Sequence, residues 1–381
     1  MMAAAVKQML HIPNDRHPSA LLPRSPCSQS ARNHRCSHPS LWLSLLWFCS
    51  AAAVAQTPAA FPGATPSDAP APWKQWIGEY GSNAAAILVL ERNGKLVFRN
   101  NDGKENILLS QGHAFILQDA SGAALTVRFL ENADARIEAV VIGDLRLPRR
   151  KVGPESGQVF RITPVHPIDE LRKQSLAASP PHEDGSFRTS DLVELVSLDR
   201  SIHLDIRYAT SDDFLGTPVY TQARAFLQRP AAESLLGALQ RLKSLGYGLL
   251  LHDAYRPWYV TKIFWDATPP ESKIFVADPA QGSRHNRGCA VDLALYDLQS
   301  GKPTEMPSTY DEMSPRSFPD YPGGTSLQRW HRDLLRWAME SEGFTVYEHE
   351  WWHFDFKDWR AYAILNVPFE QLQFTKKMYV P

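Results

Sequence analysis

The chain has 381 residues, of which 44% are hydrophobic and 21% are charged, a composition typical of a globular protein with room for more than one domain. Its 40 basic and 41 acidic side chains leave a formal net charge of -1 at pH 7. That balance excludes a general attraction to nucleic acid or to an anionic membrane surface, so any specificity must come from a local site.

Residues 1–55 have the features of an export signal with a long leader. Several arginines precede an apolar run at 41–53, and Ala-Val-Ala at 53–55 provides a small-residue cleavage site. The run is too short to span a bilayer comfortably, so no membrane span is expected in the mature protein. We predict export, to the periplasm or as a secreted protein. A lipoprotein modified at Cys49 is disfavoured by the bulky residues before it, and a buried core segment is the remaining alternative.

Cysteine usage is consistent with this cleavage. Three of the four cysteines precede the expected cut, so the mature chain keeps only Cys289. One cysteine cannot form an intramolecular disulfide, and it cannot make a cysteine-based zinc site.

Two linkers are predicted from composition. Residues 56–72 are rich in Ala and Pro and predict a flexible segment, and residues 171–190 combine prolines, a glycine and several polar side chains. The first linker precedes a first domain over residues 73–170, and the second linker separates that domain from a second over residues 191–381.

The first domain contains short β-rich runs separated by turn residues. Two runs at 87–90 and 96–98 flank Asn93-Gly94, which is a strong hairpin signal. Similar runs follow at residues 114–117, 125–130 and 137–142. We expect a small all-β accessory domain, either a sandwich or a barrel. Its ligand is unknown, and a binding module and a spacer stay equally open.

The second domain mixes helices and strands. A helix is expected from Pro230 to just before Gly246, a strand over 247–251, and an amphipathic helix over 325–342 that ends at Gly343. The order of elements indicates an α+β domain, with a small mixed or antiparallel sheet and flanking helices.

Three segments of this domain carry a candidate catalytic site. In the first, Asp292 interrupts the small and branched apolar run 289–295, which predicts a buried strand. A carboxylate there is costly unless a cation or hydrogen bonds compensate it. Gly288 permits a sharp turn, so His285 and Asp292 could converge on one Zn²⁺ ion.

The second segment, residues 348–354, adds a ligand and a base. His353 would complete three protein ligands for one zinc ion per chain and leave the fourth position for water. Glu350 could be the general base for that water. Residues three apart lie on opposite faces of a regular strand, so the backbone must turn, bulge or be helical here.

The third segment follows the expected strand over 247–251. Arg256 could stabilise the oxyanion formed when water attacks a peptide carbonyl. Asp253 could orient Arg256 through a charge-assisted pair.

Each segment alone has an ordinary explanation. An arginine beside an aspartate is often a structural ion pair, and a histidine in an apolar setting is often a hydrogen-bonded core residue. Glu-rich and Trp-rich stretches often combine packing with solvated charge, and His252, His331, Glu348 and His349 are assigned to such roles. The three segments together are much harder to explain in this way.

These residues also resemble a known family. The pattern Ser-x-His-x-x-Gly-x-Ala-x-Asp at 283–292 is similar to that of the zinc peptidases that cut D-alanyl-D-alanine. The sequence Glu-Trp-Trp-His-Phe at 350–354 resembles their dipeptidase branch, the vancomycin-resistance type. The D,D-carboxypeptidase branch shares the first pattern but usually has a different tryptophan-containing sequence before its last histidine. Segments 205–210, 253–257 and 310–313 also look like dipeptidase segments. The resemblance runs from about residue 192 to the C-terminus and excludes the β-rich domain.

The resemblance implies zinc bound by His285, Asp292 and His353. It implies Glu350 as the base that acts on water. It also implies that Arg256 stabilises the tetrahedral intermediate.

For the substrate, the resemblance implies that Asp311 and Tyr208 meet the free ammonium group and that Ser283 helps to hold one end of the dipeptide. An acidic anchor for the amine would reject longer chains. Several family members work in the cytoplasm, whereas this chain has an export signal, so salvage of wall-derived D-Ala-D-Ala is expected in place of precursor depletion.

Three functions therefore stay open from the sequence. The first is a zinc D-Ala-D-Ala dipeptidase in cell-wall peptide turnover. The second is a D,D-carboxypeptidase that trims peptidoglycan stems, which the acidic Asp311 opposes. The third is a zinc-binding or wall-binding protein without turnover, against which Glu350 and Arg256 argue, since neither is needed merely to hold a metal.

Overall fold

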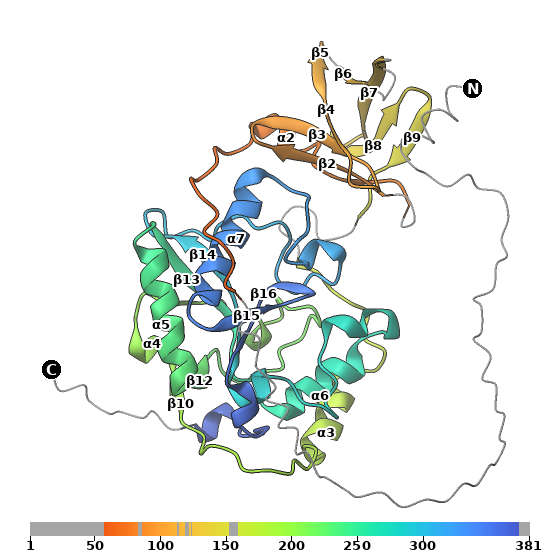
Figure 1. Cartoon of the computed structure of the whole chain (residues 1–381). Helices are drawn as coiled ribbons and strands as arrows, with labels where there is room; N and C mark the ends of the chain where they lie inside the picture. The colour runs from red at the N-terminus through yellow and green to blue at the C-terminus, as the bar shows by residue number, and fades with distance from the viewer. Residues whose placement is uncertain are drawn as a thin grey trace, which may run out of the picture.

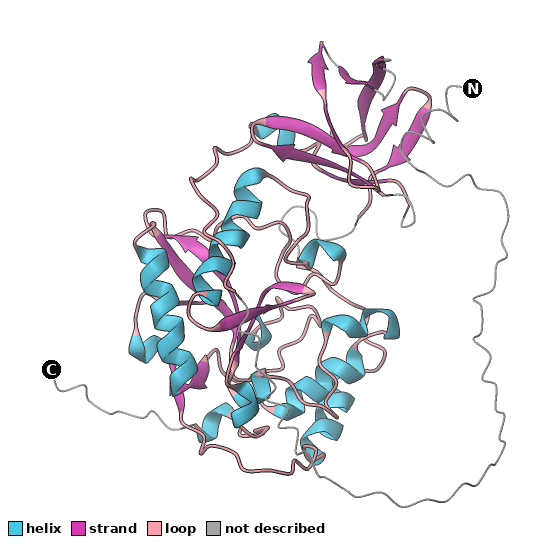
Figure 2. Ribbon diagram, in the orientation of Figure 1, coloured by secondary structure: helices cyan, strands magenta, loops and turns pink. Residues whose placement is uncertain are grey.

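The computed structural model describes residues 57–372, apart from residues 83–85, 113, 119–121, 123 and 152–158. The described chain forms an N-terminal lobe of strands and a larger C-terminal lobe of strands and helices (Figures 1 and 2). The segment expected to be an export signal, with the first three cysteines, lies outside the described residues. Within the described part, no helix combines the length and the apolar character needed to cross a membrane.

The N-terminal lobe consists of two antiparallel sheets, a four-stranded sheet in the order β1-β2-β3-β4 and a five-stranded sheet in the order β5-β6-β7-β8-β9. A short helix, α2 (Ala71–Lys74), precedes them. The strands are β1 (Gly78–Tyr80), β2 (Ile87–Arg92), β3 (Lys95–Arg99), β4 (Glu105–Ile107), β5 (Leu109–Gln111), β6 (Ala114–Gln118), β7 (Ala124–Glu131), β8 (Ile137–Ile142) and β9 (Leu145–Pro148). Buried side chains of both sheets, among them Val89, Phe98 and Val127, form one apolar cluster. The runs expected to be strands are confirmed as strands.

The expected hairpin is formed by β2 and β3. Asn93 and Gly94 both have positive φ, 51° and 73°, at the turn between Arg92 and Lys95. A two-residue turn with positive φ at both positions matches the right-handed twist of the strands it joins, which is why Asn-Gly is favoured there. The hairpin prediction is therefore confirmed.

The C-terminal lobe is built on a five-stranded mixed sheet in the order β11-β13-β14-β16-β15, beside a two-stranded sheet, β10-β12. Its strands are β10 (Leu192–Glu194), β11 (His203–Leu204), β12 (Phe226–Gln228), β13 (Tyr247–Asp253), β14 (Ala290–Asp297), β15 (Phe344–Tyr347) and β16 (Glu350–Phe356). Its α-helices are α3 (Ile168–Ala177), α4 (Leu195–Leu198), α5 (Arg229–Lys243), α6 (Trp258–Ala267) and α7 (Ser326–Glu340). The mixed α+β class expected for this part of the chain is confirmed.

The strand β14 lies at the centre of this sheet, between β13 and β16. All but the last of its residues are buried. Because side chains alternate across a strand, Val291, Leu293 and Leu295 share one face and join the apolar core with the buried leucines of α5 and α7. Asp292 therefore points from the opposite face.

The amphipathic helix predicted over 325–342 is α7. Thr325 caps its N-terminus by accepting a hydrogen bond from the Gln328 backbone N–H at 3.1 Å, while the Gln328 side chain accepts one from the Thr325 N–H at 2.9 Å. This reciprocal capping satisfies two N–H groups that a helix start leaves unpaired. Gly343, at φ 84°, follows the end of the helix.

The structure differs from the expected second linker at its first residues. Residues 171–177 belong to α3, which packs against α6. Leu171 is buried in the apolar core of the C-terminal lobe. The helix is short and mostly polar, so its buried face gives little periodic signal in the sequence.

Residues 57–70, which form most of the expected first linker, contain no helix or strand and run along α7 (Figure 1). The Phe61 ring meets the Trp337 ring edge-on at 5.0 Å, and the Trp330 indole N–H donates to the Gly63 carbonyl at 3.1 Å. These contacts tie the segment to the surface of the helix.

The two lobes meet where β2 approaches the start of α7. The Glu91 carboxylate is 2% exposed and accepts hydrogen bonds from the Ser326 backbone N–H at 2.6 Å and from the Gly94 N–H at 2.7 Å. The Arg329 guanidinium donates to the Glu91 carbonyl oxygen at 2.7 Å. Nearby, the Tyr321 hydroxyl donates to the buried Glu79 carboxylate at 3.0 Å. The lobes are thus joined by specific polar contacts.

Candidate metal centre and active site

Three neighbouring strands bring acidic and imidazole side chains into one row. Asp292 on β14 pairs with Asp253 on β13 and with His353 on β16. Side chains directly opposite one another on adjacent strands point to the same face of a sheet. The sheet register therefore places Asp253, Asp292 and His353 side by side on the face opposite to the leucines of β14.

His285 reaches this row from the short 3₁₀ turn that precedes β14. The turn covers His285–Arg287, and Gly288 then adopts φ 65° and ψ 29° before the strand begins. This left-handed conformation is readily available to glycine. The turn expected at Gly288 from the sequence is confirmed.

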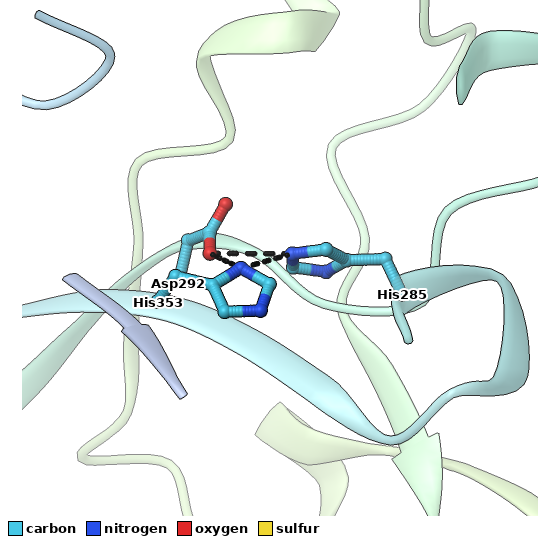
Figure 3. Close-up of side chains that lie close together, drawn as sticks. All are labelled: His285, Asp292 and His353. Carbon is cyan, nitrogen blue, oxygen red and sulfur yellow. Dashed lines mark hydrogen bonds and ion pairs between the residues drawn. The ribbon is translucent and has the colours of Figure 1, made fainter. Parts of the chain in front are cut away.

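The side chains of His285, Asp292 and His353 converge on one point, as Figure 3 shows. His285 Nε2 lies 3.2 Å from Asp292 Oδ1, His353 Nδ1 lies 3.0 Å from the same oxygen, and the two nitrogens are 3.0 Å apart. All three residues are buried. The structure thus brings together the three residues that the sequence pattern singled out.

This donor set fits a metal ion. Ligands about 2.0–2.1 Å from a tetrahedral zinc ion lie roughly 3.3 Å apart, close to the spacing seen here. Asp292 Oδ1 is buried and makes no hydrogen bond. A buried carboxylate oxygen without a donor is costly, and a cation at the centre of the three donors would compensate it.

Each histidine is oriented through its other ring nitrogen. His285 Nδ1 lies 2.6 Å from the Ala254 carbonyl oxygen, and His353 Nε2 lies 2.9 Å from Asp355 Oδ1. Such partners fix the tautomer and direct the free nitrogen toward a metal. Asp355 was not predicted from the sequence, although its position two residues after His353 in a strand places both side chains on one face.

A bulge in β16 brings Glu350 to the same site. Tyr347 pairs with Glu350 and Val346 pairs with Phe354, so one step on β15 corresponds to four residues on β16. As a result, the Glu350 carboxylate lies 3.7 Å from His353 Nδ1 although the two residues are three apart. The irregular backbone expected from the spacing of Glu350 and His353 is confirmed.

The charges of the site perturb one another strongly. Burial raises the pKa of Glu350 to about 8, with the nearby Asp292 carboxylate adding to the shift and His353 opposing it. Burial also opposes ionisation of Asp292, but the two histidines outweigh it and hold the pKa of Asp292 below its ordinary value. Burial lowers the pKa of His353, whereas Asp355 and Asp292 outweigh that effect and raise it to about 10. A carboxyl group with a pKa near neutral is suited to exchange protons at physiological pH.

Arg256 is held at the edge of the site by Asp253. The Asp253 Oδ2 atom accepts from Arg256 Nε at 2.9 Å and lies 2.8 Å from Arg256 Nη2, while Oδ1 accepts from the Tyr220 hydroxyl at 2.7 Å. The guanidinium also lies over the Phe264 ring, 4.7 Å from its centroid. Asp253 and Arg256 are both buried, so the guanidinium group has a fixed position, with Nη2 3.8 Å from Asp292 Oδ2. This pairing of Asp253 with Arg256 was expected.

Asp311 and Tyr208 form a second acidic position in the pocket. The Tyr208 hydroxyl donates to Asp311 Oδ1 at 2.9 Å, whereas the buried Asp311 Oδ2 makes no hydrogen bond. Burial raises the pKa of the Asp311 carboxyl well above its ordinary value, and the Asp292 charge adds to the shift. Asp311 also has φ 60°, a strained conformation for a residue with a side chain. An ammonium group beside Oδ2 would relieve the cost of burying this carboxylate.

The metal-donor residues, Glu350 and the expected substrate-binding residues, Ser283 among them, line one pocket. The Ser283 hydroxyl oxygen accepts a hydrogen bond from the His285 backbone N–H at 3.2 Å, which helps to shape the turn that carries the histidine. The pocket is lined by the candidate site residues Tyr208, Arg256, Ser283, His285, Asp292, Asp311, Glu350 and His353, with an apolar wall of Phe214, Phe264, Ile274, Val276, Met313 and Trp352. A small polar molecule with an apolar side chain matches this lining.

Comparison with known proteins places this arrangement in context. Residues 188–374 match the family described as "D-ala-D-ala dipeptidase". The chain is 33% identical over 181 residues to a D-alanyl-D-alanine dipeptidase of Escherichia coli, an alignment that covers 48% of this chain and 92% of that protein. It is 37% identical over 185 residues to one of Enterococcus faecium, covering 42% and 90%, and 32% identical over 188 residues to one of Streptomyces coelicolor, covering 45% and 93%. The N-terminal lobe lies outside the matched family segment.

Proposed function

This chain belongs to the D-Ala-D-Ala dipeptidase family of peptidases, and on that premise we propose that it hydrolyses free D-alanyl-D-alanine to two D-alanine molecules. The observation that carries the proposal is one pocket that combines three metal-donor atoms, a buried carboxylate of raised pKa and a second carboxylate with an unpartnered oxygen. The first two features serve peptide hydrolysis, and the third serves recognition of a free amine.

We assign the metal to zinc, one ion per chain, held by His285, Asp292 and His353. When bound, the ion supplies Lewis-acid chemistry, which polarises the peptide carbonyl and makes a water molecule more acidic. Two histidines and one carboxylate with an open position suit that metal and that role.

The side chains of the pocket perform the remaining tasks. Glu350, whose carboxylate lies 3.7 Å from His353 Nδ1, accepts a proton from the attacking water and returns it to the leaving amine. Arg256, fixed by Asp253, stabilises the negative charge that develops on the carbonyl oxygen. Asp311, supported by Tyr208, pairs with the ammonium group of the dipeptide, and Ser283 contacts one end of it.

This assignment favours a dipeptidase over a D,D-carboxypeptidase. A stem peptide has an amide where a free dipeptide has an ammonium group, and an amide would leave the Asp311 carboxylate buried without a counter-charge. The unpartnered Asp311 Oδ2 atom is therefore the feature that discriminates between the two substrates. A non-catalytic zinc-binding protein would have no use for Glu350 or for Arg256.

For the setting, we propose that the protein acts outside the cytoplasm, in the periplasm or as a secreted enzyme, on dipeptide released during cell-wall turnover. The N-terminal lobe is proposed as an accessory domain whose ligand is undefined. Because it contacts the start of α7 through Glu91, it is also a structural partner of the peptidase lobe.

The test is D-alanine release by the zinc-loaded mature protein, with D-Ala-D-Ala and a stem pentapeptide ending in D-Ala-D-Ala assayed in parallel. We expect release from the dipeptide only. Glu350→Gln should lower kcat by about 10²–10⁴-fold, because the general base is lost. Glu348→Gln is the matched control, since that side chain is 79% exposed, and it should retain activity. Release from the pentapeptide would move the assignment to a carboxypeptidase, and no release from either substrate by a zinc-bound protein would leave the binding-protein alternative.

A further inference from the structure

Tyr310 lies between the candidate metal ligands and the Tyr208–Asp311 pair, and no role was expected for it from the sequence. Its side chain is buried, with 3% exposed. Its hydroxyl oxygen is 3.0 Å from Asp292 Oδ2 and 2.9 Å from the Tyr208 hydroxyl oxygen. Tyr208 in turn donates to Asp311 Oδ1. A continuous chain of hydrogen bonds therefore runs from Asp292 to Asp311 through two tyrosine hydroxyls.

The direction of these bonds follows from the number of hydrogens. Tyr208 has one hydroxyl hydrogen, and Asp311 accepts it. The single hydroxyl hydrogen of Tyr310 therefore has two possible acceptors, the Asp292 carboxylate and the Tyr208 oxygen. It is either shared between them or donated to the carboxylate, which is the stronger acceptor because it is charged. Asp292 thus uses Oδ1 toward the histidines and Oδ2 toward Tyr310.

The ring of Tyr310 is fixed on two sides. It stacks on the His252 ring at 4.4 Å between centroids and 16° between planes, and the Trp352 ring meets it edge-on at 5.5 Å. His252 is itself anchored, with Nδ1 3.2 Å from Asp205 Oδ2. A ring packed in this way has little freedom, so its hydroxyl marks a defined point between Asp292 and Tyr208.

We propose that Tyr310 is a positioning residue that ties the amine anchor, Tyr208 and Asp311, to the metal ligand Asp292. It thereby fixes the span between the bound ammonium group and the metal site, and this span sets how many residues fit between the free amine and the scissile carbonyl. The inference rests on the proposed function, because it takes Asp311 as the partner of the dipeptide ammonium group.

The first test uses Tyr310→Phe, which removes the hydroxyl and keeps the ring. Without the bridge, the anchor is held less firmly, so the Kd of D-Ala-D-Ala for the metal-free protein should rise about tenfold, as for loss of a hydrogen bond to a charged group. KM of the zinc-loaded enzyme should rise by a similar factor while kcat changes about twofold or less, because Glu350 and Arg256 are untouched. Calorimetry measures the first quantity without any turnover.

The matched control is Tyr296→Phe. Tyr296 is also a buried tyrosine stacked on a histidine, 3.9 Å from the His203 ring, and its hydroxyl donates to the Ser201 carbonyl oxygen at 2.6 Å, away from the pocket. This variant should change melting temperature about as much as Tyr310→Phe does and should leave KM and the dipeptide Kd unaltered.

A double-mutant cycle with Asp311→Asn shows whether Tyr310 acts through the anchor. In that background, Tyr310→Phe should change the dipeptide Kd by about twofold or less, since the group it positions is already impaired. Two outcomes would overturn the inference. One is that Tyr310→Phe also raises the dipeptide Kd about tenfold in the Asp311→Asn background, and the other is that Tyr310→Phe alone leaves the Kd within twofold of wild type. Failure of the proposed function itself would appear in the wild-type protein, as zinc binding without release of D-alanine.

Discussion

Asp355 contacts the outward nitrogen of His353, and Arg284 Nε lies 3.3 Å from the other carboxylate oxygen of Asp355. Burial opposes ionisation of Asp355, but His353 and Arg284 outweigh it and lower its pKa, so the carboxylate stays charged. A charged acceptor behind an imidazole holds the ring in place and increases its basicity toward a metal.

We therefore expect Asp355→Asn to weaken zinc binding by about 10–100-fold, as is usual for loss of such a partner. Competition with a chromophoric chelator measures this affinity independently of catalysis. Asp358→Asn provides the control, because Asp358 pairs with Arg188 at the surface and makes no contact with the histidines. Equal zinc affinities in the two variants would show that Asp355 does not support the site.

Asp213 is a buried carboxylate in the loop before Phe214, outside the candidate active site. Its Oδ1 accepts from the backbone N–H groups of Leu215 at 2.8 Å and Gly216 at 2.7 Å, whereas Oδ2 has no partner. Burial raises its pKa from an ordinary value of 3.8 to about 6, against the opposing effect of these N–H groups and of Arg161. The folded state therefore binds this proton more tightly than the unfolded state does.

A raised pKa contributes stability that is fully present below pH 3.8 and is lost as the pH rises through about 6. Asparagine does not ionise, so the Asp213→Asn variant does not lose this stability as the pH rises. Relative to wild type, the variant should thus gain about 2–3 kcal/mol in the free energy of unfolding between pH 4 and pH 7, as expected for a shift of about two pKa units. Urea unfolding of both proteins at the two pH values checks this. A difference that does not vary with pH would mean that Asp213 is ionised at the same pH in both states.

At the level of elements, the turn into β14 depends on Gly288. Its φ of 65° is unfavourable for any residue with a side chain, and an added Cβ would lie 2.4 Å from Leu192 Cδ2 and 3.4 Å from the Gln228 backbone nitrogen. The turn therefore has two requirements, a left-handed backbone and close approach to β10 and β12.

Gly288→Ala should lower the free energy of unfolding by about 2–4 kcal/mol and weaken zinc binding, because it displaces the turn that carries His285. Gly301→Ala separates the two requirements. Gly301 has φ 69° and no atom within 4 Å of the added Cβ, so that variant should lose only about 1 kcal/mol. Thermal unfolding and chelator competition on both variants provide the comparison, and equal losses would show that the contact with Leu192 is easily relieved.

At the scale of the whole molecule, the N-terminal lobe is attached to the peptidase lobe at the start of α7. The Glu91 carboxylate receives the Ser326 N–H and hydroxyl, so an acidic side chain of one lobe lies at the N-terminus of a helix of the other. Both the hydrogen bonds and the positive end of the helix dipole favour a negative charge there. The contact is buried, so loss of the carboxylate would leave buried N–H groups unsatisfied, whereas loss of a surface ion pair costs little.

We expect Glu91→Ala to lower the free energy of unfolding by about 2–3 kcal/mol, because it leaves buried N–H groups without acceptors. Scanning calorimetry should show the N-terminal lobe unfolding at a lower temperature than the peptidase lobe in this variant. Glu138→Ala is the control within the same lobe, since Glu138 and its partner Arg146 are 45% and 53% exposed, and it should change stability by about 0.5 kcal/mol or less. Similar scans for the two variants would show that Glu91 does not couple the lobes.

The sequence by itself determined the local features of this protein. The Asn-Gly hairpin, the amphipathic helix α7 and the buried strand β14 follow from turn chemistry, helical periodicity and apolar pattern within a few residues. The three metal-donor residues could also be predicted, because a carboxylate inside an apolar strand is costly unless a cation compensates it, and His285 and His353 are suitable further ligands. The resemblance to a known family pointed to the same side chains.

Only the tertiary structure decided which side chains support these residues. Tyr310 and Glu91 act through partners far away in the sequence, and Asp355 supports His353 only because the fold brings that histidine to the site, so the local pattern around all three is that of ordinary strand and loop residues. The bulge that places Glu350 beside His353 depends on pairing with β15, and the helical state of α3 depends on packing against α6. Such features are fixed by burial and by register between distant segments, which no local pattern of residues encodes.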